Sequence, residues 1–171
     1  MKMLSTVGAG CLVIESDQVL LVQPNYGPAK GQWMFPGGFI NDNESPEDAA
    51  LRELWEETGQ VGKVIPPLCI RYRQAPTDIY WVFQVELTLN TPISVLTSEL
   101  LDVRFWPVKE AIHSPLVRPM SRFFLESALA PPLSNVPLPR GHDDTHRVFF
   151  FEPSDFHHAQ VHYQRNERLA Q

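Results

Sequence analysis

Carboxylates crowd one short stretch of the 171-residue chain. In GGFINDNESPEDAALRELWEETGQ, residues 37–60, seven acidic side chains accompany a single base, Arg52. Like charges at this density repel one another and cost stability unless a partner compensates them. Carboxylate oxygens suit a hard divalent cation such as Mg²⁺ or Mn²⁺, so metal-assisted chemistry is the first hypothesis.

The second half of this stretch carries the start and stop signals of a helix. Ser45 can cap the helix, with Asp48 three residues later, and Pro46 suits the first helical position. Gly59 can adopt the left-handed conformation that commonly ends a helix. The sequence therefore predicts a helix over residues 46–58.

The side chains of this helix divide into two faces. At about 100° per residue, Glu53, Glu56 and Glu57 share one face. The opposite face, predicted to pack on a sheet, holds Leu51, Leu54, Trp55 and Thr58. The acidic face is either a solvated surface or a cation site. No lysine lies between Lys30 and Lys63 to balance its charge, which favours the cation site.

The elements that must position this helix read as strands and helices in alternation. Two strands are predicted around a polar turn at residues 15–18. Further strands are predicted over residues 68–74, 79–89, 102–108 and 146–153. Residues 109–129 predict a helix in two pieces, because Pro115 and Pro119 interrupt it. This order favours a mixed sheet with helices packed on it.

The acidic stretch resembles the signature of the Nudix hydrolases, G-x5-E-x7-R-E-hydrophobic-x-E-E-x-G. Eight fixed positions over 22 residues match without a gap: Gly38, Glu44, Arg52, Glu53, Leu54, Glu56, Glu57 and Gly59. The FPGG sequence that precedes them also fits the family. One position departs from the signature, since Gln60 stands where the family has an aliphatic residue.

The resemblance implies a fold and a domain boundary. The fold class would be α/β, a Nudix α/β/α sandwich with a mixed central β-sheet. The Nudix domain would span residues 1–130. Residues 131–171 would form a proline-rich connector and a C-terminal extension that packs on the domain or on a partner subunit.

The resemblance also implies a metal centre on the acidic face. Glu53, Glu56 and Glu57 would hold Mg²⁺ or Mn²⁺. The carbonyl group of Gly38 or of its neighbour would complete the metal shell. The cofactor would therefore be a divalent cation, with no preference between the two metals.

The catalytic roles implied by the resemblance fall on five residues. Arg52 would orient a catalytic carboxylate, with Glu44 as its partner. The base that takes a proton from the attacking water differs among family members. We rank Glu57 and Glu53 first for this role. Glu99 ranks second, because it precedes a strand where the family often has such a glutamate.

Substrate contacts are sought among basic and aromatic residues outside the acidic stretch. Arg71 and Arg73 are two positions apart in a predicted strand and share a face, so they could grip phosphates with help from Lys30. A solvated strand face is the alternative. Trp33 is a candidate for stacking on a base, although aromatic residues in strands commonly belong to a core.

The function implied is metal-dependent hydrolysis of the diphosphate linkage in a nucleoside diphosphate derivative, by water attack on phosphorus. ADP-ribose or another nucleotide sugar is favoured as substrate, and a nucleoside triphosphate comes second. The rival reading is a non-catalytic Nudix-like module that senses a nucleotide, which would be expected to lose acidic residues of the signature. A prenyl diphosphate isomerase would need a reactive cysteine, and Cys69 lies in an apolar run.

Composition limits the partners. The formal net charge of −6 and a pI of about 5.5 argue against a nucleic-acid surface. Two cysteines make no disulfide framework, and the first residues contain no signal peptide or membrane span, so a cytoplasmic location is expected. A homodimer is left open. The histidine pairs at 142 and 146 and at 158 and 162 are read as surface or oligomer contacts, with a second metal as the alternative.

Overall fold

The computed structural model describes residues 5–89, 91–95, 97–129 and 145–151. Their strands are β1 (Thr6–Leu12), β2 (Ile14–Glu15), β3 (Gln18–Pro24), β4 (Gly37–Phe39), β5 (Gly62–Arg73), β6 (Asp78–Leu87), β7 (Leu100–Pro107) and β8 (His146–Phe150). Their helices are the 3-10 turn η1 (Gly27–Ala29), α1 (Pro46–Thr58), α2 (Val108–Ala111) and α3 (Pro119–Leu129). No helix in the described part of the chain is both long and apolar enough to span a bilayer.

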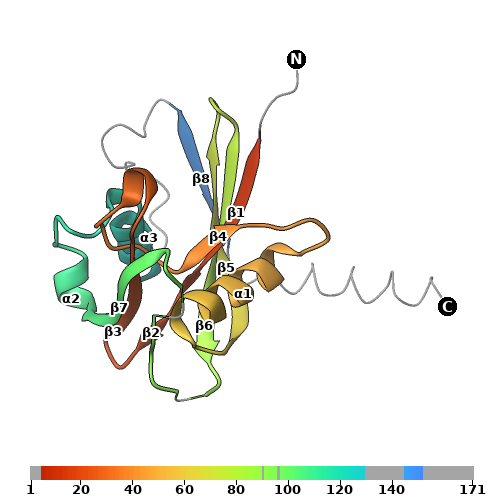
Figure 1. The fold of residues 1–171 in the computed structure, drawn as a ribbon. Coiled ribbons are helices and arrows are strands. Elements are labelled where there is room, and N and C mark those ends of the chain that lie inside the picture. The colour runs from red at the N-terminus through yellow and green to blue at the C-terminus, as the bar shows by residue number, and fades with distance from the viewer. Residues whose placement is uncertain (1–4, 90, 96, 130–144, 152–171) are drawn as a thin grey trace.

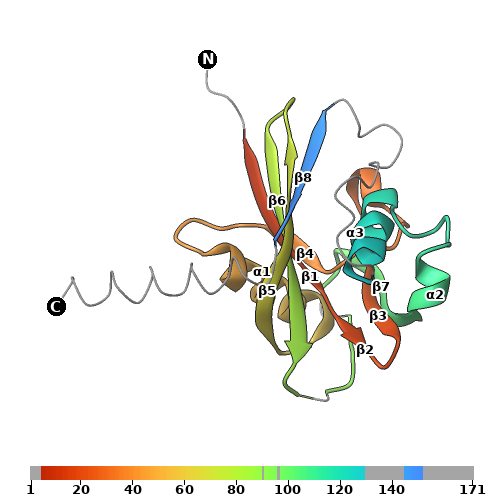
Figure 2. The same ribbon diagram turned by 180° about the vertical axis from the view of Figure 1, so that it is seen from behind.

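The described strands form two hydrogen-bonded sheets. The larger has the order β4-β1-β6-β5-β8, in which β1 and β6 run parallel and the other pairs antiparallel. The smaller has the order β2-β3-β7 and is antiparallel. Helix α1 lies on one side of the strands, and α2 and α3 lie on the other (Figures 1 and 2). The predicted α/β class, with a mixed sheet between helical layers, is confirmed.

Alternation along the strands separates two apolar cores. Leu20 and Val22 of β3 pack with Leu54 of α1, whereas Val19 and Leu21 contribute to the core that α3 covers. This is the two-residue period expected of a strand with both faces buried. The strands therefore have a helical layer on each side, and α1 packs on them through residues between Ala49 and Thr58.

Helix α1 has the bounds that its local signals predict. The hydroxyl of Ser45 accepts a hydrogen bond from the Asp48 N–H at 3.1 Å. Gly59 takes the left-handed conformation with φ 72°, and its N–H donates to the carbonyl of Trp55 at 2.9 Å. Both ends are thus specified by capping groups within the segment, which is why sequence alone located them.

The orientation of α1 differs from the prediction. Trp55, expected on the buried face, is 56% exposed, while Glu57, expected to face away, is only 8% exposed. On a helical wheel Glu57 lies about 60° from Leu54, whereas Trp55 lies about 100° away on the other side. The helix is rotated so that Ala49, Ala50 and Leu54 seat on the sheet. This rotation carries Glu57 inward.

Strand β5 begins earlier than predicted and includes both prolines of the segment at 66–67. The pairing with β6 shifts register between Val64 and Pro67 and again between Pro67 and Cys69. A proline cannot donate to a ladder, so the strand accommodates it by a bulge. The predicted strand at residues 146–153 is observed as β8, which pairs antiparallel with β5 from Cys69–Phe150 to Arg73–His146.

The predicted break in residues 109–129 is confirmed, with α2 and α3 on either side of it. Cys11 and Cys69 are both buried free thiols. The predicted proline-rich connector and the histidines at 142, 157, 158 and 162 lie outside the described residues. His146 is described, and it lies buried in β8.

Candidate functional site

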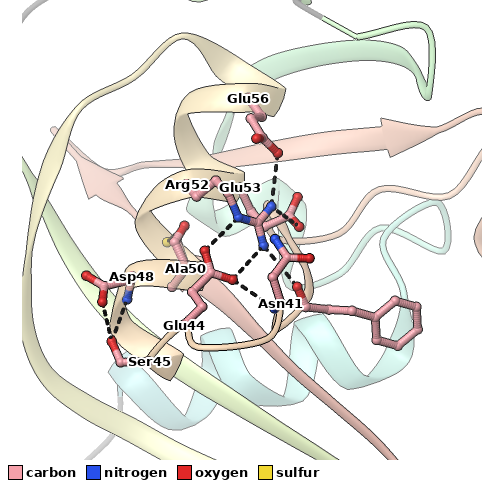
Figure 3. Close-up of polar contacts among 10 residues, drawn as sticks. Asn41, Glu44, Ser45, Asp48, Ala50, Arg52, Glu53 and Glu56 are labelled. Carbon is pink, nitrogen blue, oxygen red and sulfur yellow. Dashed lines mark hydrogen bonds and ion pairs between the residues drawn. The ribbon is translucent and has the colours of Figure 1, made fainter.

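Arg52 is the centre of the polar contacts on α1 (Figure 3). Its Nε and Nη2 donate to the two carboxylate oxygens of Glu44 at 2.7 and 3.0 Å, a bidentate pair. Its Nη1 donates to Glu53 at 2.8 Å and to Glu56 at 3.0 Å, and Nη2 also donates to the carbonyl of Phe39 at 2.9 Å. One guanidinium therefore fixes three carboxylates and the end of β4 relative to one another.

The pairing of Arg52 with Glu44 keeps Glu44 ionised. The hydrogen bonds from Arg52, followed by that from the Asn41 N–H at 3.0 Å, hold the pKa of the Glu44 carboxyl below its ordinary value. The same contact with Glu44 raises the pKa of Arg52 further above its already high value. The predicted partnership of these two residues is present in the structure as a charge-assisted bridge across the loop that precedes α1.

The pKa of Glu57 is shifted in the opposite direction to that of Glu44. Its carboxyl is buried, and one oxygen accepts a hydrogen bond from the Gly37 N–H at 2.9 Å. Burial, and then the negative charges of Glu53, Glu99 and Glu56, raise its pKa to about 8. Burial likewise raises the pKa of Glu53, although Arg52 opposes the shift. Glu57 therefore forms no ion pair with any residue in the part of the chain that the structure describes.

The donor set fits a divalent cation, although the described residues contain no preformed cage of three ligating side chains. Glu53 and Glu56 are engaged with Arg52, and Glu57 is engaged with Gly37. Arg52 is the one base bonded to Glu53 and Glu56, and the buried Glu57 has no ion pair among the described residues, so acidic groups outnumber basic ones on this face. That surplus is the condition under which a hard cation binds.

The two glycines of β4 allow the chain to pass against these carboxylates. Gly37 has φ 155°, a conformation that L side chains rarely adopt. A Cβ atom at Gly38 would collide with the carboxylate of Glu53. Glycine at 38 therefore sets how closely β4 approaches α1, and it places the β4 backbone beside the carboxylates.

Alanine at Gly38 is expected to displace the carboxylate of Glu53 and to weaken Mn²⁺ binding by about tenfold or more. Paramagnetic resonance titration of Mn²⁺ measures this directly. Gly62→Ala is the matched control, because a Cβ at Gly62, the first residue of β5, would crowd the Val85 side chain and the Glu86 backbone of β6 instead of a carboxylate. Equal Mn²⁺ affinity in Gly38→Ala and wild type would show that Glu53 is not a ligand.

The raised pKa of Glu57 predicts a pH dependence of stability in EDTA. Between the ordinary value of 4.5 and about 8, the folded protein retains a proton on Glu57 that the unfolded chain releases. Rising pH through this window therefore destabilises the fold, by at most about 1.4 kcal/mol per pH unit from this group. Urea unfolding of wild type and Glu57→Gln between pH 5 and 8.5 tests it. The wild type should lose stability relative to the variant as pH rises, and parallel curves would contradict the shift.

A cavity of about 230 Å³ opens beside Glu57. Its wall includes Tyr26, Gly37 and Met34, together with Arg118. The negative charges of Glu99, Glu57 and Glu53 raise the pKa of Tyr26, after the larger effect of burial.

Glu99 therefore faces the same region as the acidic side chains of α1. Its charge acts on Glu53, on Glu57 and on Tyr26. Glu99 is exposed, and its backbone carbonyl accepts a hydrogen bond from the Asn25 N–H at 2.7 Å. The three candidates for the base, Glu53 and Glu57 on α1 and Glu99 before β7, are thus close enough for their charges to interact.

The predicted substrate contacts divide in the structure. Arg71 and Arg73 line a second cavity, of about 350 Å³. Lys30 is exposed at the end of η1 and lines neither this cavity nor the one beside Glu57. Trp33 is only 3% exposed, and its ring packs edge-on against Trp106, at 5.3 Å between centroids. A substrate base cannot stack on this buried ring. The prediction that Trp33 binds the substrate is therefore wrong, and Trp33 belongs to the core.

Arg118 is the site residue that the sequence analysis missed. It lies directly before α3 and lines both cavities. One feature of the sequence could have identified Arg118. It stands directly before the first residue of α3, where helices favour an acidic or neutral residue over a basic one.

Several known proteins are similar to this chain. Residues 4–127 match the family model of the NUDIX domain. Nudix hydrolase 6 of Arabidopsis thaliana is 31% identical over 118 residues, which cover 64% of this chain and 41% of that protein. The ADP-sugar pyrophosphatase of Mus musculus is 51% identical over 62 residues, covering 33% of this chain and 28% of that protein. The chain thus spans less than half the length of these curated relatives.

Among solved structures, the Nudix domain of Shewanella oneidensis NrtR complexed with ADP ribose is similar, with a TM-score of 0.61 and 27% identity. The similarity covers 75% of this chain and 88% of that one. The family match ends before β8, so the strand that carries His146 lies outside it.

Proposed function

The chain belongs to the Nudix family, and from that premise we propose that it is a metal-dependent pyrophosphohydrolase. It would cleave the diphosphate linkage of a nucleoside diphosphate derivative by attack of water on phosphorus. The observation that carries the proposal is the buried carboxyl of Glu57, which lies among other acidic groups at the wall of a cavity. A solvated acidic face would not bury one of its carboxylates without a positive partner.

Glu53, Glu56 and Glu57 would hold Mg²⁺ or Mn²⁺, with a backbone carbonyl of Gly38 or its neighbour. A bound cation supplies neutralisation of the phosphate charge and lowers the pKa of a coordinated water. Arg52 keeps Glu53 and Glu56 in place through hydrogen bonds of 2.8 and 3.0 Å. The support for these three metal ligands is that acidic groups outnumber basic ones around them.

The reaction needs one proton acceptor. Water adds its oxygen to one phosphorus, its proton passes to a carboxylate, and the bond from that phosphorus to the bridging oxygen breaks. The products are a nucleoside monophosphate and a phosphorylated second group, or their equivalents. Glu57 and Glu53 remain the first candidates for the acceptor, with Glu99 second, and Glu44 and Arg52 act by positioning.

The favoured substrates are ADP-ribose and other nucleotide sugars, with nucleoside triphosphates second. The local similarity to an ADP-sugar pyrophosphatase and the likeness to a domain that holds ADP ribose support this order. A cytoplasmic location and a homodimer stay predictions, as does the role of residues 131–171 as an extension of the domain at 1–130.

A panel of nucleotides tests the proposal. Phosphorus NMR follows products from ADP-ribose, nucleotide sugars, nucleoside triphosphates, NADH and a dinucleoside polyphosphate, each with Mg²⁺ or Mn²⁺. Cleavage of a nucleotide sugar to a monophosphate and a sugar phosphate is expected. If no compound is cut while one of them binds, the chain is a nucleotide-sensing module.

A further inference from the structure

The cavity of about 350 Å³ adjoins the cavity beside Glu57. Met34 and Arg118 contribute to the walls of both. Among the described residues, the charged groups of the first cavity are Glu57 and Arg118, whereas the second cavity is lined by three arginines and one carboxylate, Asp78. The second cavity is therefore the more basic of the two.

The positive charges of the second cavity are unequally compensated. Arg71 forms an ion pair with Asp78, and Asp78 also accepts a hydrogen bond from the hydroxyl of Thr6. Arg73 donates to the carbonyl of Pro76 at 3.2 Å. Arg118 forms no side-chain hydrogen bond or ion pair with any residue in the described part of the chain.

Arg118 is also placed where a positive charge is unfavourable for the protein alone. Burial lowers the pKa of its guanidinium, and the nearby charge of Arg71 lowers it further. It stands at the N-terminal end of α3, an 11-residue helix whose first turn holds no acidic side chain. The carbonyl of Arg118 accepts the first backbone hydrogen bond of that helix, from Arg122 at 3.0 Å. Two guanidiniums and the positive end of a helix dipole thus meet at one place.

This arrangement is costly unless an anion occupies it. Like charges held together in a half-buried setting destabilise the fold, and a bound phosphate would reverse the sign of the interaction. A guanidinium pairs with phosphate through two parallel hydrogen bonds, which Arg118 has free to offer. Tyr80, Phe124 and Met120 make part of the remaining wall apolar. Ser121 and His146 are polar members of the same wall.

We propose that Arg118, assisted by Arg71, binds one phosphate group of the substrate, next to the phosphate whose charge a cation at Glu57 would neutralise. The inference rests on the proposed function, which gives Glu57 its role at the reacting phosphate. It identifies Arg118 as a substrate-binding residue and implies that the substrate spans both cavities, with its diphosphate crossing at Met34 and Arg118. Strand β8 closes the second cavity with His146, so the segment beyond the family match helps to select the substrate.

Binding of simple anions in EDTA tests the anion site without any turnover. Sodium pyrophosphate and sodium phosphate are titrated into ¹⁵N-labelled protein, and the arginine Nε–Hε resonances are followed. Saturable shifts of the Arg118 resonance are expected, with affinity falling about tenfold to a hundredfold in Arg118→Gln. Tighter binding of pyrophosphate assigns the site to the diphosphate of the substrate, and equal binding assigns it to a phosphate product. Both results support an anion site at Arg118.

Two further variants make the test specific. Arg118→Lys keeps the charge but loses the planar fork, so an intermediate affinity is expected. Lys63→Gln removes one exposed positive charge from β5, distant from the cavity, and should bind pyrophosphate as the wild type does. Unchanged thermal unfolding shows that each variant folds. Equal losses in Arg118→Gln and Lys63→Gln would overturn the proposal, because the effect would then be general electrostatics.

Kinetics separate this inference from the proposed function. With a substrate from the nucleotide panel, Arg118→Gln should raise KM about tenfold or more while kcat changes less. If no nucleotide is cut but pyrophosphate still shifts Arg118, the proposed hydrolysis fails and the anion site stands. If a nucleotide is cut and Arg118→Gln has wild-type KM, the anion site fails and the hydrolysis stands.

Discussion

Glu57→Gln is expected to lower the rate of nucleotide hydrolysis by at least about a thousandfold while nucleotide binding persists. Glutamine has the same size and can still accept the hydrogen bond that Gly37 donates at 2.9 Å, so the fold should be retained. What is lost is the negative charge that would hold the cation and take a proton. Single-turnover hydrolysis and calorimetric nucleotide binding measure the two quantities separately.

Glu47→Gln is the matched control for this result. Glu47 lies in the first turn of the same helix, but it is exposed and makes no contact with Arg52 or Gly37 among those described. Its substitution should leave the rate within about twofold, because a single exposed charge contributes little. Comparable losses in both variants would indicate that the net charge of α1, and not a metal site at Glu57, governs the rate.

Arg52→Gln is expected to lower turnover by roughly a hundredfold and to weaken Mn²⁺ binding, although Arg52 is not itself a ligand. Its guanidinium holds Glu44 through two bonds and Glu53 and Glu56 through one each. Without it, three carboxylates repel one another and lose their fixed orientation. Hydrolysis measured across a range of Mn²⁺ concentrations should show both a lower maximum and a higher half-saturation.

Lysine at the same position distinguishes charge from geometry. Arg52→Lys restores one positive charge but cannot make the bidentate pair with Glu44, so only partial recovery is expected. Arg104→Gln provides a control, since Arg104 pairs with Asp102 on an exposed part of β7. Full activity in Arg52→Lys would mean that charge alone matters and that the fork with Glu44 is not required.

Much of the acidic site could be predicted because its determinants are local. The caps at Ser45 and Gly59 delimit α1 within the segment itself, and the spacing of Glu53, Glu56 and Arg52 fixes their proximity. The pairing of Arg52 with Glu44 followed from the resemblance to a known signature. Each of these features depends on residues fewer than ten positions apart.

The features that escaped prediction depend on distant parts of the chain. The rotation of α1 that exposes Trp55 and buries Glu57 is decided by how Ala49, Ala50 and Leu54 fit the sheet. The core position of Trp33 depends on Trp106, far along the sequence. Arg118 reaches the site because α3 packs beside β5 and β6, which no local periodicity reveals.

The one departure from the family signature also has a consequence for the loop that follows β6. Gln60 is 1% exposed, and its amide donates to the carbonyl and the hydroxyl of Thr91 at 3.0 and 3.2 Å. An aliphatic residue at position 60 could pack against any apolar segment that covers it. The Gln60 amide instead needs hydrogen-bond acceptors at defined positions, which Thr91 supplies. Gln60 therefore anchors Thr91, eight residues before the candidate base Glu99, to the exit of α1. Most surface loops tolerate insertions. Residues inserted between Thr91 and Glu99 would instead change how far the Glu99 carboxylate lies from α1.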